Sequence, residues 1–290
     1  MKISDEGFKI TTGTDGVDKL LFDSSRAKEC AGFAVKNNLR RIMLNPHHGY
    51  LANDIEPIIP LKDFIDGLII GSEKIRYENI ELFKNLNFLG LPDNQIDTVD
   101  LSDFPNLTVL ACMITERLKG LEACKNLKSL TFSYYKPKSN DLTSLPALES
   151  LQHLSIIVSG IITLRGIERY CNLRKLEIFQ ASKLERILQL QSISNLVEIE
   201  FDKCKNLRDW EILGNMQSLK KIIISDSGSF KNLAFVKRLP NLEFISFCGT
   251  NVLDGNIRYC EGIKYVGFDD KRHYTHKMKD FKERCHAPEL

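Results

Sequence analysis

The sequence predicts an α/β repeat solenoid, an architecture in which short units stack along one axis. Three observations support this prediction. A motif of apolar residues at its first, fourth and sixth positions occurs twelve times. Successive copies begin between about 20 and 26 residues apart, a period typical of solenoids. The 290 residues are 43% hydrophobic, which supplies a large core, and a repeat array can exceed ordinary domain size because each unit packs on its neighbours.

The spacing of the motif indicates strands that stack in parallel. Its last two apolar residues lie two apart, so both point to one side of a short strand. Stacking the strands buries that side, while the intervening residues point onto the opposite, concave surface. The copies are Val17-Leu20-Phe22, Leu39-Ile42-Leu44, Ile65-Leu68-Ile70, Leu86-Leu89-Leu91, Leu107-Leu110-Cys112, Leu127-Leu130-Phe132, Leu151-Leu154-Ile156, Leu173-Leu176-Ile178, Leu196-Ile199-Phe201, Leu219-Ile222-Ile224, Leu242-Ile245-Phe247 and Ile263-Val266-Phe268.

Over residues 17–268 the pattern resembles that of the leucine-rich-repeat family, L-x-x-L-x-L-x-x-N/C-x-L. The copy that starts at Leu86 matches fully, with Asn94 and Ile96, and the copy at Leu196 matches through Cys204 with one extra residue. The unit length and return segments look like short bacterial, internalin-type repeats. The resemblance implies a horseshoe with a parallel sheet on its concave face and short helices or irregular segments on its convex face.

The chain departs from the family pattern at the asparagine or cysteine position, so we expect irregular turns instead of an unbroken asparagine ladder. The residues there are Ser25, His47, Thr115, Tyr135, Ser159, Ala181, Ser227 and Thr250.

We predict one domain, residues 1–290. Residues 1–16 form a strand or hairpin over the first edge, residues 17–268 form about twelve repeats, and residues 269–290 form a polar cap and a tail that starts with a basic helical stretch. Ser25 is expected to cap a helix from Arg26 to about Asn37. The insertions at residues 46–60 and 134–140 are expected to form loops.

Composition argues against nucleic-acid and membrane partners. The net charge is +2, the aromatic content is 9%, and no leader or membrane-length apolar run is visible. We therefore expect a cytoplasmic protein, monomeric when alone. The eight cysteines contain no C-x-x-C pair and are expected to be reduced, with Cys112, Cys124, Cys171 and Cys260 buried as small hydrophobes.

No catalytic, phosphate-binding or metal-binding motif is present, so we expect no enzyme activity, no cofactor and no metal. His47-His48 and His273-x-x-His276 lack the spaced third ligand that a zinc site needs, and Cys285-His286 is assigned no role.

The outward strand positions are the candidate binding residues. Copies two to five present small or apolar residues there, which the 46–60 insertion either covers or leaves exposed. Glu198, Glu200 and Asp202 then occupy alternate positions of one strand and repel one another, unless a cationic partner or the adjacent Lys175 and Lys221 neutralise them. The predicted partner-binding residues are Phe88, Met113, His153, Lys175, Phe179, Glu198, Glu200, Asp202, Lys221, Phe244 and Tyr265.

These features favour a non-catalytic module that binds another protein on its concave face, and the acidic strand suits a partner with a basic surface. A narrower alternative is a bacterial cytosolic inhibitor or immunity protein that neutralises a toxin or enzyme. A third alternative, an enzyme on a solenoid scaffold, lacks a recognisable site.

Overall fold

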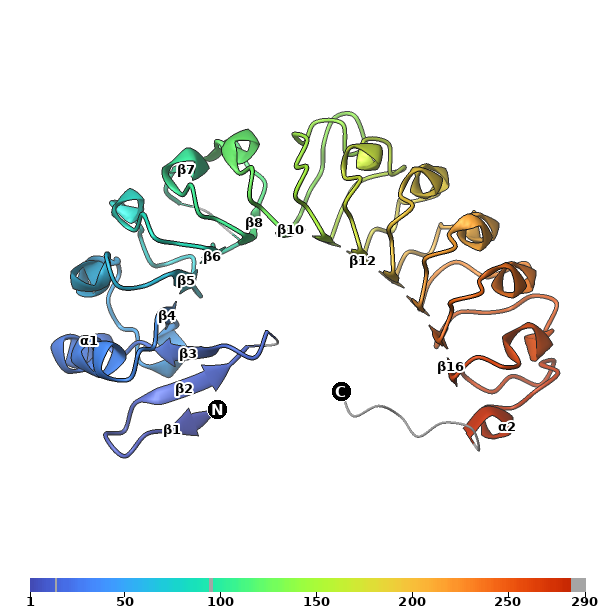
Figure 1. Cartoon of the computed structure of the whole chain (residues 1–290), viewed down its shortest axis with the longest axis horizontal. Coiled ribbons are helices and arrows are strands. Elements are labelled where there is room, and N and C mark those ends of the chain that lie inside the picture. Colours follow the sequence, from blue (N-terminus) through green and yellow to red (C-terminus); the bar gives the residue numbers. More distant parts are fainter. Residues whose placement is uncertain (14, 94–95, 283–290) are drawn as a thin grey trace. The chain divides into compact units, whose positions relative to one another are not determined.

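The computed structural model describes residues 1–13, 15–93 and 96–282. The chain divides into two compact units, unit 1 (Met1–Thr131) and unit 2 (Phe132–Leu290), and the division falls within strand β10 (Ser129–Ser133). In each unit the strands of a sheet lie on one face and short helices lie on the other (Figure 1). That a single domain spans the chain stays a prediction.

Unit 1 begins with an antiparallel arrangement. Strand β1 (Lys2–Ile3) pairs with β2 (Lys9–Thr12), which pairs with β3 (Asp18–Leu21). From β3 onward the pairing is parallel, through β4 (Arg41–Leu44), β5 (Gly67–Ile70), β6 (Phe88–Gly90) and β8 (Val109–Met113). A second small sheet joins β7 (Val99–Asp100) to β9 (Leu118–Lys119). The helices are η1 (Ser24–Arg26), α1 (Ala27–Lys36), η2 (Pro46–His48), η3 (Glu56–Leu61), η4 (Ile80–Leu82), η5 (Leu101–Asp103) and η6 (Leu121–Ala123).

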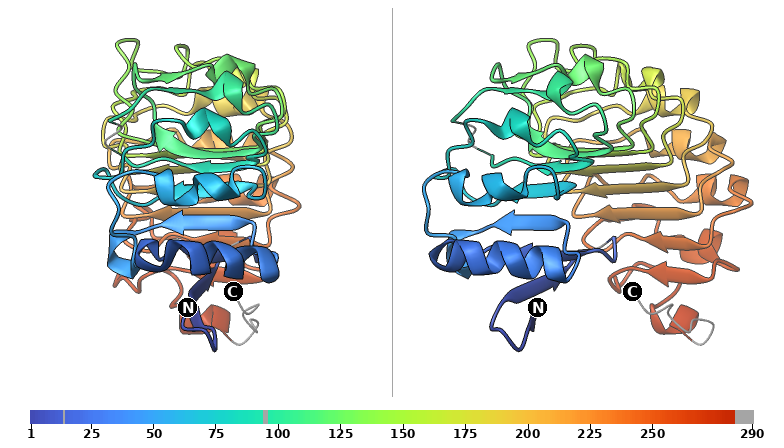
Figure 2. Two further views of the ribbon diagram at one scale, coloured as in Figure 1. Left: turned by 90° about the vertical axis from the view of Figure 1, so that its left-hand side faces the viewer. Right: turned by 60° about the vertical axis from the view of Figure 1, so that its left-hand side comes forward.

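Unit 2 continues the same repeat. Its strands pair in parallel and in chain order, and they lie side by side in Figure 2. They are β11 (His153–Ile157), β12 (Lys175–Phe179), β13 (Glu198–Asp202), β14 (Lys221–Ser225), β15 (Phe244–Ser246) and β16 (Tyr265–Gly267). The helices are η7 (Ile167–Arg169), η8 (Leu188–Ser192), η9 (Trp210–Asn215), η10 (Ala234–Arg238), η11 (Ile257–Cys260) and α2 (Lys279–Lys282).

The core consists of the motif residues, as the sequence predicts. Leu110, Leu154 and Leu176 are fully buried, and the other motif positions are also buried, with two exceptions at the ends. Val17, which directly precedes β3, is 38% exposed, and Ile263 in the last copy is partly exposed. Each of these residues has a repeat on one side only. The leucine-rich-repeat solenoid is confirmed as the fold class.

The helix near the N-terminus begins differently from the prediction. Asp23, not Ser25, is the capping residue: its carboxylate accepts a hydrogen bond from the Ser25 N–H at 3.0 Å and so caps η1. The α-helix α1 then begins at Ala27 without a side-chain cap. The carboxylate is the stronger acceptor, which explains the shift of two residues.

The 46–60 insertion lies on the helix face of unit 1. Its helix η3 packs against α1, and Ile55 and Ile58 are buried there. The outward side chains of β4, β5 and β6 stay half-buried. The alternative in which this insertion covers the apolar strand face is therefore wrong.

The turns after the strands of unit 2 replace an asparagine ladder with mixed side chains. The Ala181 N–H donates to Cys204 Sγ. The Cys204 N–H donates to Ser227 Oγ, and the Ser227 N–H donates to Thr250 Oγ1, each at 3.0 Å. Sulfur and hydroxyl acceptors thus take the place that the family pattern gives to asparagine. Asn94 lies outside the described residues.

The residue before each of these positions adopts a left-handed conformation. Such φ values recur at Tyr134, Val158, Gln180, Lys203, Asp226 and Gly249. Only one of the six is glycine, and Val158 is β-branched, so the conformation is imposed by the stacking of the repeats rather than favoured locally.

The described cysteines are free thiols, but one prediction about them is wrong. Cys112, Cys124 and Cys260 are buried as expected, whereas Cys171 is exposed. Burial raises the pKa of the Cys204 and Cys260 thiols to about 12. Cys285 lies outside the described residues. Among the described residues, none of the helices has the length and apolar character needed to cross a membrane.

Replacement of Leu154 by Ala is expected to lower the free energy of unfolding by about 2–5 kcal/mol, because it leaves a cavity between packed repeats. Chemical denaturation followed by circular dichroism measures this loss. Arg174→Ala, at an exposed position in the neighbouring repeat, is the control and should change stability by less than about 0.5 kcal/mol. If Leu154→Ala and Arg174→Ala both had the same free energy of unfolding as the parent protein, the burial of Leu154 between packed repeats would be contradicted.

Alkylation of the native protein should label Cys171 and Cys248 quickly and leave Cys30, Cys112, Cys124, Cys204 and Cys260 protected until the protein unfolds. Burial excludes the reagent and disfavours the reactive thiolate. Peptide mass spectrometry after timed labelling reads out each site. Fast labelling of Cys112 or Cys204 in the folded protein would refute the burial described here.

Candidate functional site

The parallel register of unit 2 arranges the outward side chains into three rows. The first row runs His153, Lys175, Glu198, Lys221, Phe244 and Tyr265. The second runs Ser155, Glu177, Glu200, Ile223, Ser246 and Gly267. The third runs Ile157, Phe179, Asp202 and Ser225. We call these rows the strand face of unit 2.

Glu177 is the centre of an ion-pair cluster on this face. Its carboxylate lies 2.8 Å from His153 Nε2 and 2.6 Å from Lys175 Nζ. Burial alone would raise the pKa of Glu177, but the hydrogen bonds from His153 and Lys175 and their charges lower it to about 2. Glu177 is therefore a fully compensated carboxylate.

The carboxylates of β13 are in a different situation. Lys175 is bound to Glu177, and Lys221 lies over the ring of Phe244, so neither lysine makes an ion pair with Glu198 or Glu200. Burial, followed by the charge of Glu177, raises the pKa of Glu200, and the charges of Lys175 and Lys221 offset this only in part. Among the described residues, Asp202 is the one of these three acidic side chains that has an ion-pair partner, Lys203 Nζ at 3.9 Å.

Two aromatic rings complete the strand face of unit 2. Phe244 and Tyr265 stack with ring centroids 4.2 Å apart and planes 7° apart. Lys221 Nζ lies 5.3 Å from the centroid of Phe244. Aromatic residues are enriched in protein-binding surfaces, whereas carboxylates are depleted there.

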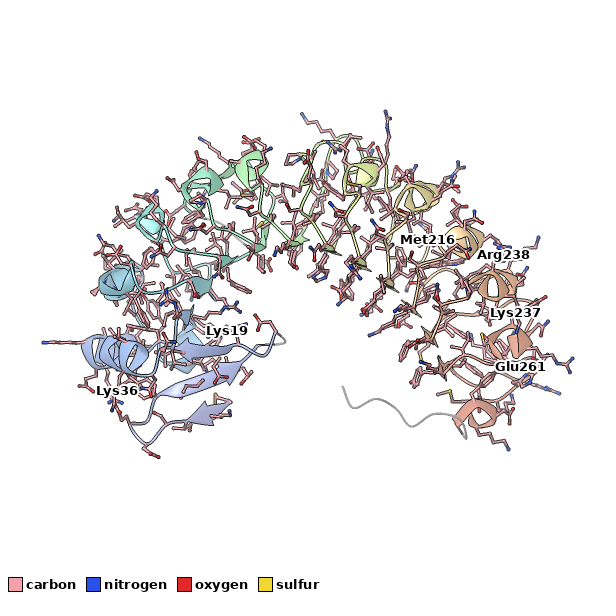
Figure 3. The ribbon with its side chains drawn as sticks, viewed as in Figure 1. Lys19, Lys36, Met216, Lys237, Arg238 and Glu261 are labelled. Carbon is pink, nitrogen blue, oxygen red and sulfur yellow. The ribbon has the colours of Figure 1, made fainter. Side chains whose placement is uncertain are left out.

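In unit 1, two cations approach the ring of Phe88. Lys19 Nζ and Arg41 Cζ lie 5.2 Å and 5.0 Å from its ring centroid. Arg41 reaches the ring across Gly67, where a Cβ atom would come within 2.7 Å of Arg41 Cγ. Arg41 also forms an ion pair with Asp15. The N-terminal segment thus supplies partners for Phe88, and Lys19 projects to the strand side of unit 1 (Figure 3).

All eleven predicted site residues lie on strands with half-buried side chains, as the outward alternation requires. Phe88 and Met113 belong to β6 and β8 of unit 1, and the other nine belong to unit 2. The prediction omitted Glu177 from the site, although its alternation with Lys175 and Phe179 placed it on the same face. The binding role of these residues stays a prediction.

The histidines considered for metal binding have other contacts. His273 Nε2 lies 3.0 Å from the Val252 carbonyl, and His276 Nε2 lies 3.3 Å from Glu261. Glu261 lies on the helix side of unit 2, as do Lys237 and Arg238 (Figure 3). Within the described ranges, no three histidine, cysteine or acidic side chains are grouped as a metal ion requires.

Comparison with known proteins shows the fold. No family profile matches the sequence, and no curated protein sequence matches it. The functional domain of InlJ from Listeria monocytogenes, which includes a cysteine ladder, is similar in structure with a TM-score of 0.51 and 16% identity, over 78% of this chain and 51% of that one. Internalin F from Listeria monocytogenes aligns over 89% of this chain and 84% of its own, at 13% identity and a TM-score of 0.48.

A chain of the TLR13–ssRNA13 complex aligns over 86% of this chain and 49% of its own, at 13% identity and a TM-score of 0.47. These neighbours are leucine-rich-repeat proteins. This chain thus spans about half the length of the InlJ and TLR13 chains. The likeness to InlJ shows that the chain has a leucine-rich-repeat fold, and at this identity it shows the fold alone.

Glu177→Gln and Glu200→Gln should change stability in opposite directions. The pKa of Glu177 is depressed, so its contribution is present above pH 4.5 and is lost as the pH falls toward about 2. Glu177→Gln should therefore destabilise the protein at pH 7, and the difference in unfolding free energy between variant and parent should shrink below pH 4.5.

The pKa of Glu200 is raised, so its ionisation costs stability as the pH rises above 4.5. Glu200→Gln should therefore stabilise the protein at pH 7. Urea unfolding between pH 2.5 and 7 measures both differences. Destabilisation by both variants at pH 7 would show that Glu200 is compensated like Glu177.

Proposed function

We propose that the chain is a non-catalytic protein-binding module and that the strand face of unit 2 contacts the partner. One observation carries the proposal. Glu198 and Glu200 lie on β13 without an ion-pair partner among the described residues, and the stacked rings of Phe244 and Tyr265 lie on the same face, with Lys221 of β14 between them. Carboxylates and aromatic rings on one face support electrostatic steering together with apolar anchoring.

The partner that suits this face has a basic surface. Four carboxylates lie at outward positions of β12 and β13, and two nearby side chains, His153 and Lys175, are both bound to Glu177. A positively charged partner surface would neutralise the remaining carboxylates, whereas a nucleic acid or an anionic membrane would be repelled. The monomeric state of the free protein and its cytoplasmic location remain part of this proposal.

An inhibitor or immunity role is a narrower form of the same proposal. A face that carries Glu198, Glu200 and Asp202 on one strand would mask a basic active-site cleft. Loss of a captured enzyme's activity on addition of this protein would support the inhibitor. Binding that leaves that activity unchanged would favour a scaffold.

The double charge reversal Glu198→Lys/Glu200→Lys should weaken binding of a partner by about 10-fold or more at low salt, because close charge pairs across an interface contribute several kcal/mol. The partner is first isolated by affinity capture with the parent protein, and then purified. Surface plasmon resonance with pure components at 50 mM and 500 mM salt gives affinity and association rate. For the parent, association should slow as salt rises.

The matched control is Lys125→Glu/Lys128→Glu, a double reversal at exposed return-segment positions of unit 1. It should leave affinity within about two-fold, because exposed charges far from an interface contribute little. Circular dichroism verifies the fold of both variants. Unchanged affinity of the 198/200 variant at both salt concentrations would reject the strand face of unit 2 as the binding surface.

A further inference from the structure

The side chains of Lys221, Phe244 and Tyr265 form one continuous stack across the last three strands. They occupy the same position of β14, β15 and β16 and follow one another in register. One ring face of Phe244 carries the Lys221 ammonium, and Phe244 and Tyr265 stack at 4.2 Å. Among the described residues, neither a ring nor a cation lies on the second face of Tyr265. The stack therefore ends in an aromatic surface on the last strand.

The next row leaves the edges of the rings uncovered. Along β14, β15 and β16 its side chains shrink from Ile223 to Ser246 to Gly267. At Gly267 a Cβ atom would come within 3.0 Å of Tyr265 Cε1, so the ring of Tyr265 lies across the glycine. Phe244 and Tyr265 both remain half-buried rather than buried. The rings can thus be reached from the side of the second row.

Carboxylates lie on the other side of Ile223. Glu200 is the register partner of Ile223, and Glu198 is the register partner of Lys221. With neighbouring strands about 4.8 Å apart, the rings of β15 lie about 10 Å from β13. Lys221 and Tyr265 cover the two faces of Phe244, so the open ring face is the outer face of Tyr265, and a ligand that stacks there and also reaches β13 must extend across three strand spacings. The Lys221 ammonium already lies on Phe244, so the chain itself uses a cation on this stack.

We propose that the stack of Phe244 and Tyr265, with Glu198 and Glu200 beside it, docks an arginine-bearing segment of a protein partner. Two arginines of such a segment suit this surface: one planar guanidinium stacks on the open face of Tyr265, and the other binds Glu198 or Glu200 with two parallel hydrogen bonds. This assignment rests on the proposed function and names the partner chemistry of the same face. Charge complementarity is the argument for the occupant.

Two other occupants are disfavoured by the same side chains. A single-stranded nucleic acid would stack bases on Tyr265, but its phosphates would meet Glu198 and Glu200. A second copy of this chain would bring the same carboxylates into a like-charged interface if the two faces met. Both are tested as outcomes of the experiment below.

The probe is the capped hexapeptide Gly-Arg-Tyr-Gly-Arg-Gly, compared with the same peptide carrying citrulline in place of both arginines. Citrulline keeps the planar shape and removes the charge. Binding to the full chain is measured by titration calorimetry and by shifts of the aromatic NMR signals of Phe244 and Tyr265. The arginine peptide should bind about 10-fold more tightly than the citrulline peptide, since a charge-assisted bidentate contact is lost.

The variants Tyr265→Ala, Phe244→Leu and Glu200→Gln should each lower the affinity for the arginine peptide about 5- to 10-fold, as expected when an aromatic or charged anchor is removed. The matched control Val109→Ala changes an outward apolar residue of β8 in unit 1 and should leave affinity unchanged. Thermal unfolding verifies that each variant is folded, and Glu200→Gln is expected to fold at least as stably as the parent.

Equal binding of the arginine and citrulline peptides, or unchanged affinity in all three variants, would overturn the assignment. Tighter binding of a ten-nucleotide oligouridylate than of the arginine peptide would overturn it in favour of nucleic acid. A concentration-dependent dimer that Tyr265→Ala disrupts would overturn it in favour of a second copy. If the arginine peptide binds no better than the citrulline peptide while Glu198→Lys/Glu200→Lys still weakens binding of the purified partner, the arginine assignment is wrong and the proposed function stands.

Discussion

The identical register of neighbouring parallel strands is the constraint on which the rest of the structure depends. In unit 2, Leu154 is paired with Leu176 and Leu176 with Ile199, so apolar residues meet apolar residues on the buried side. Because side chains alternate with a period of two, a slip by one residue would move Glu177 and Glu200 into the core and the leucines into solvent. Burial of the motif therefore fixes the register. The register in turn arranges the polar strand face.

The same constraint explains what could be predicted from the sequence. The motif gave the fold class and the buried side of each strand, and the alternation placed all eleven candidate residues on the opposite side. Ion-pair partners could not be predicted in this way. Lys175 pairs with Glu177, two residues along its own strand, rather than with Glu198 on the next strand, because side-chain direction and not sequence distance decides the contact.

The errors lie where a residue lacks a repeat on one side or belongs to a return segment. Val17 and Ile263 fit the motif, but each is the first motif residue of a terminal copy and is exposed or partly exposed, whereas the fourth and sixth residues of the same copies are buried. Cys124 and Cys260 lie three residues before the first apolar position of the next copy and are buried, whereas Cys171 lies only two residues before it and is exposed. Tyr170 occupies the buried position in that repeat. The turns, by contrast, tolerate varied sequences: sulfur in Cys204 and hydroxyls in Ser227 and Thr250 accept equivalent backbone hydrogen bonds.

The two central glutamates show how stability and binding oppose each other on one row. Glu177 and Glu200 are register partners, and both are half-buried. The hydrogen bonds from His153 and Lys175 compensate the burial of Glu177, whereas the charge of Glu177 adds to the burial that raises the pKa of Glu200. A glutamine at position 200 would keep the shape and remove this cost. Local conflicts of this kind are expected at functional sites, where a residue is tuned for a ligand and not for the free protein. A cation from a partner would form with Glu200 the kind of ion pair that Lys175 forms with Glu177. The favourable free energy of that ion pair would then strengthen binding, because it is absent from the free folded protein.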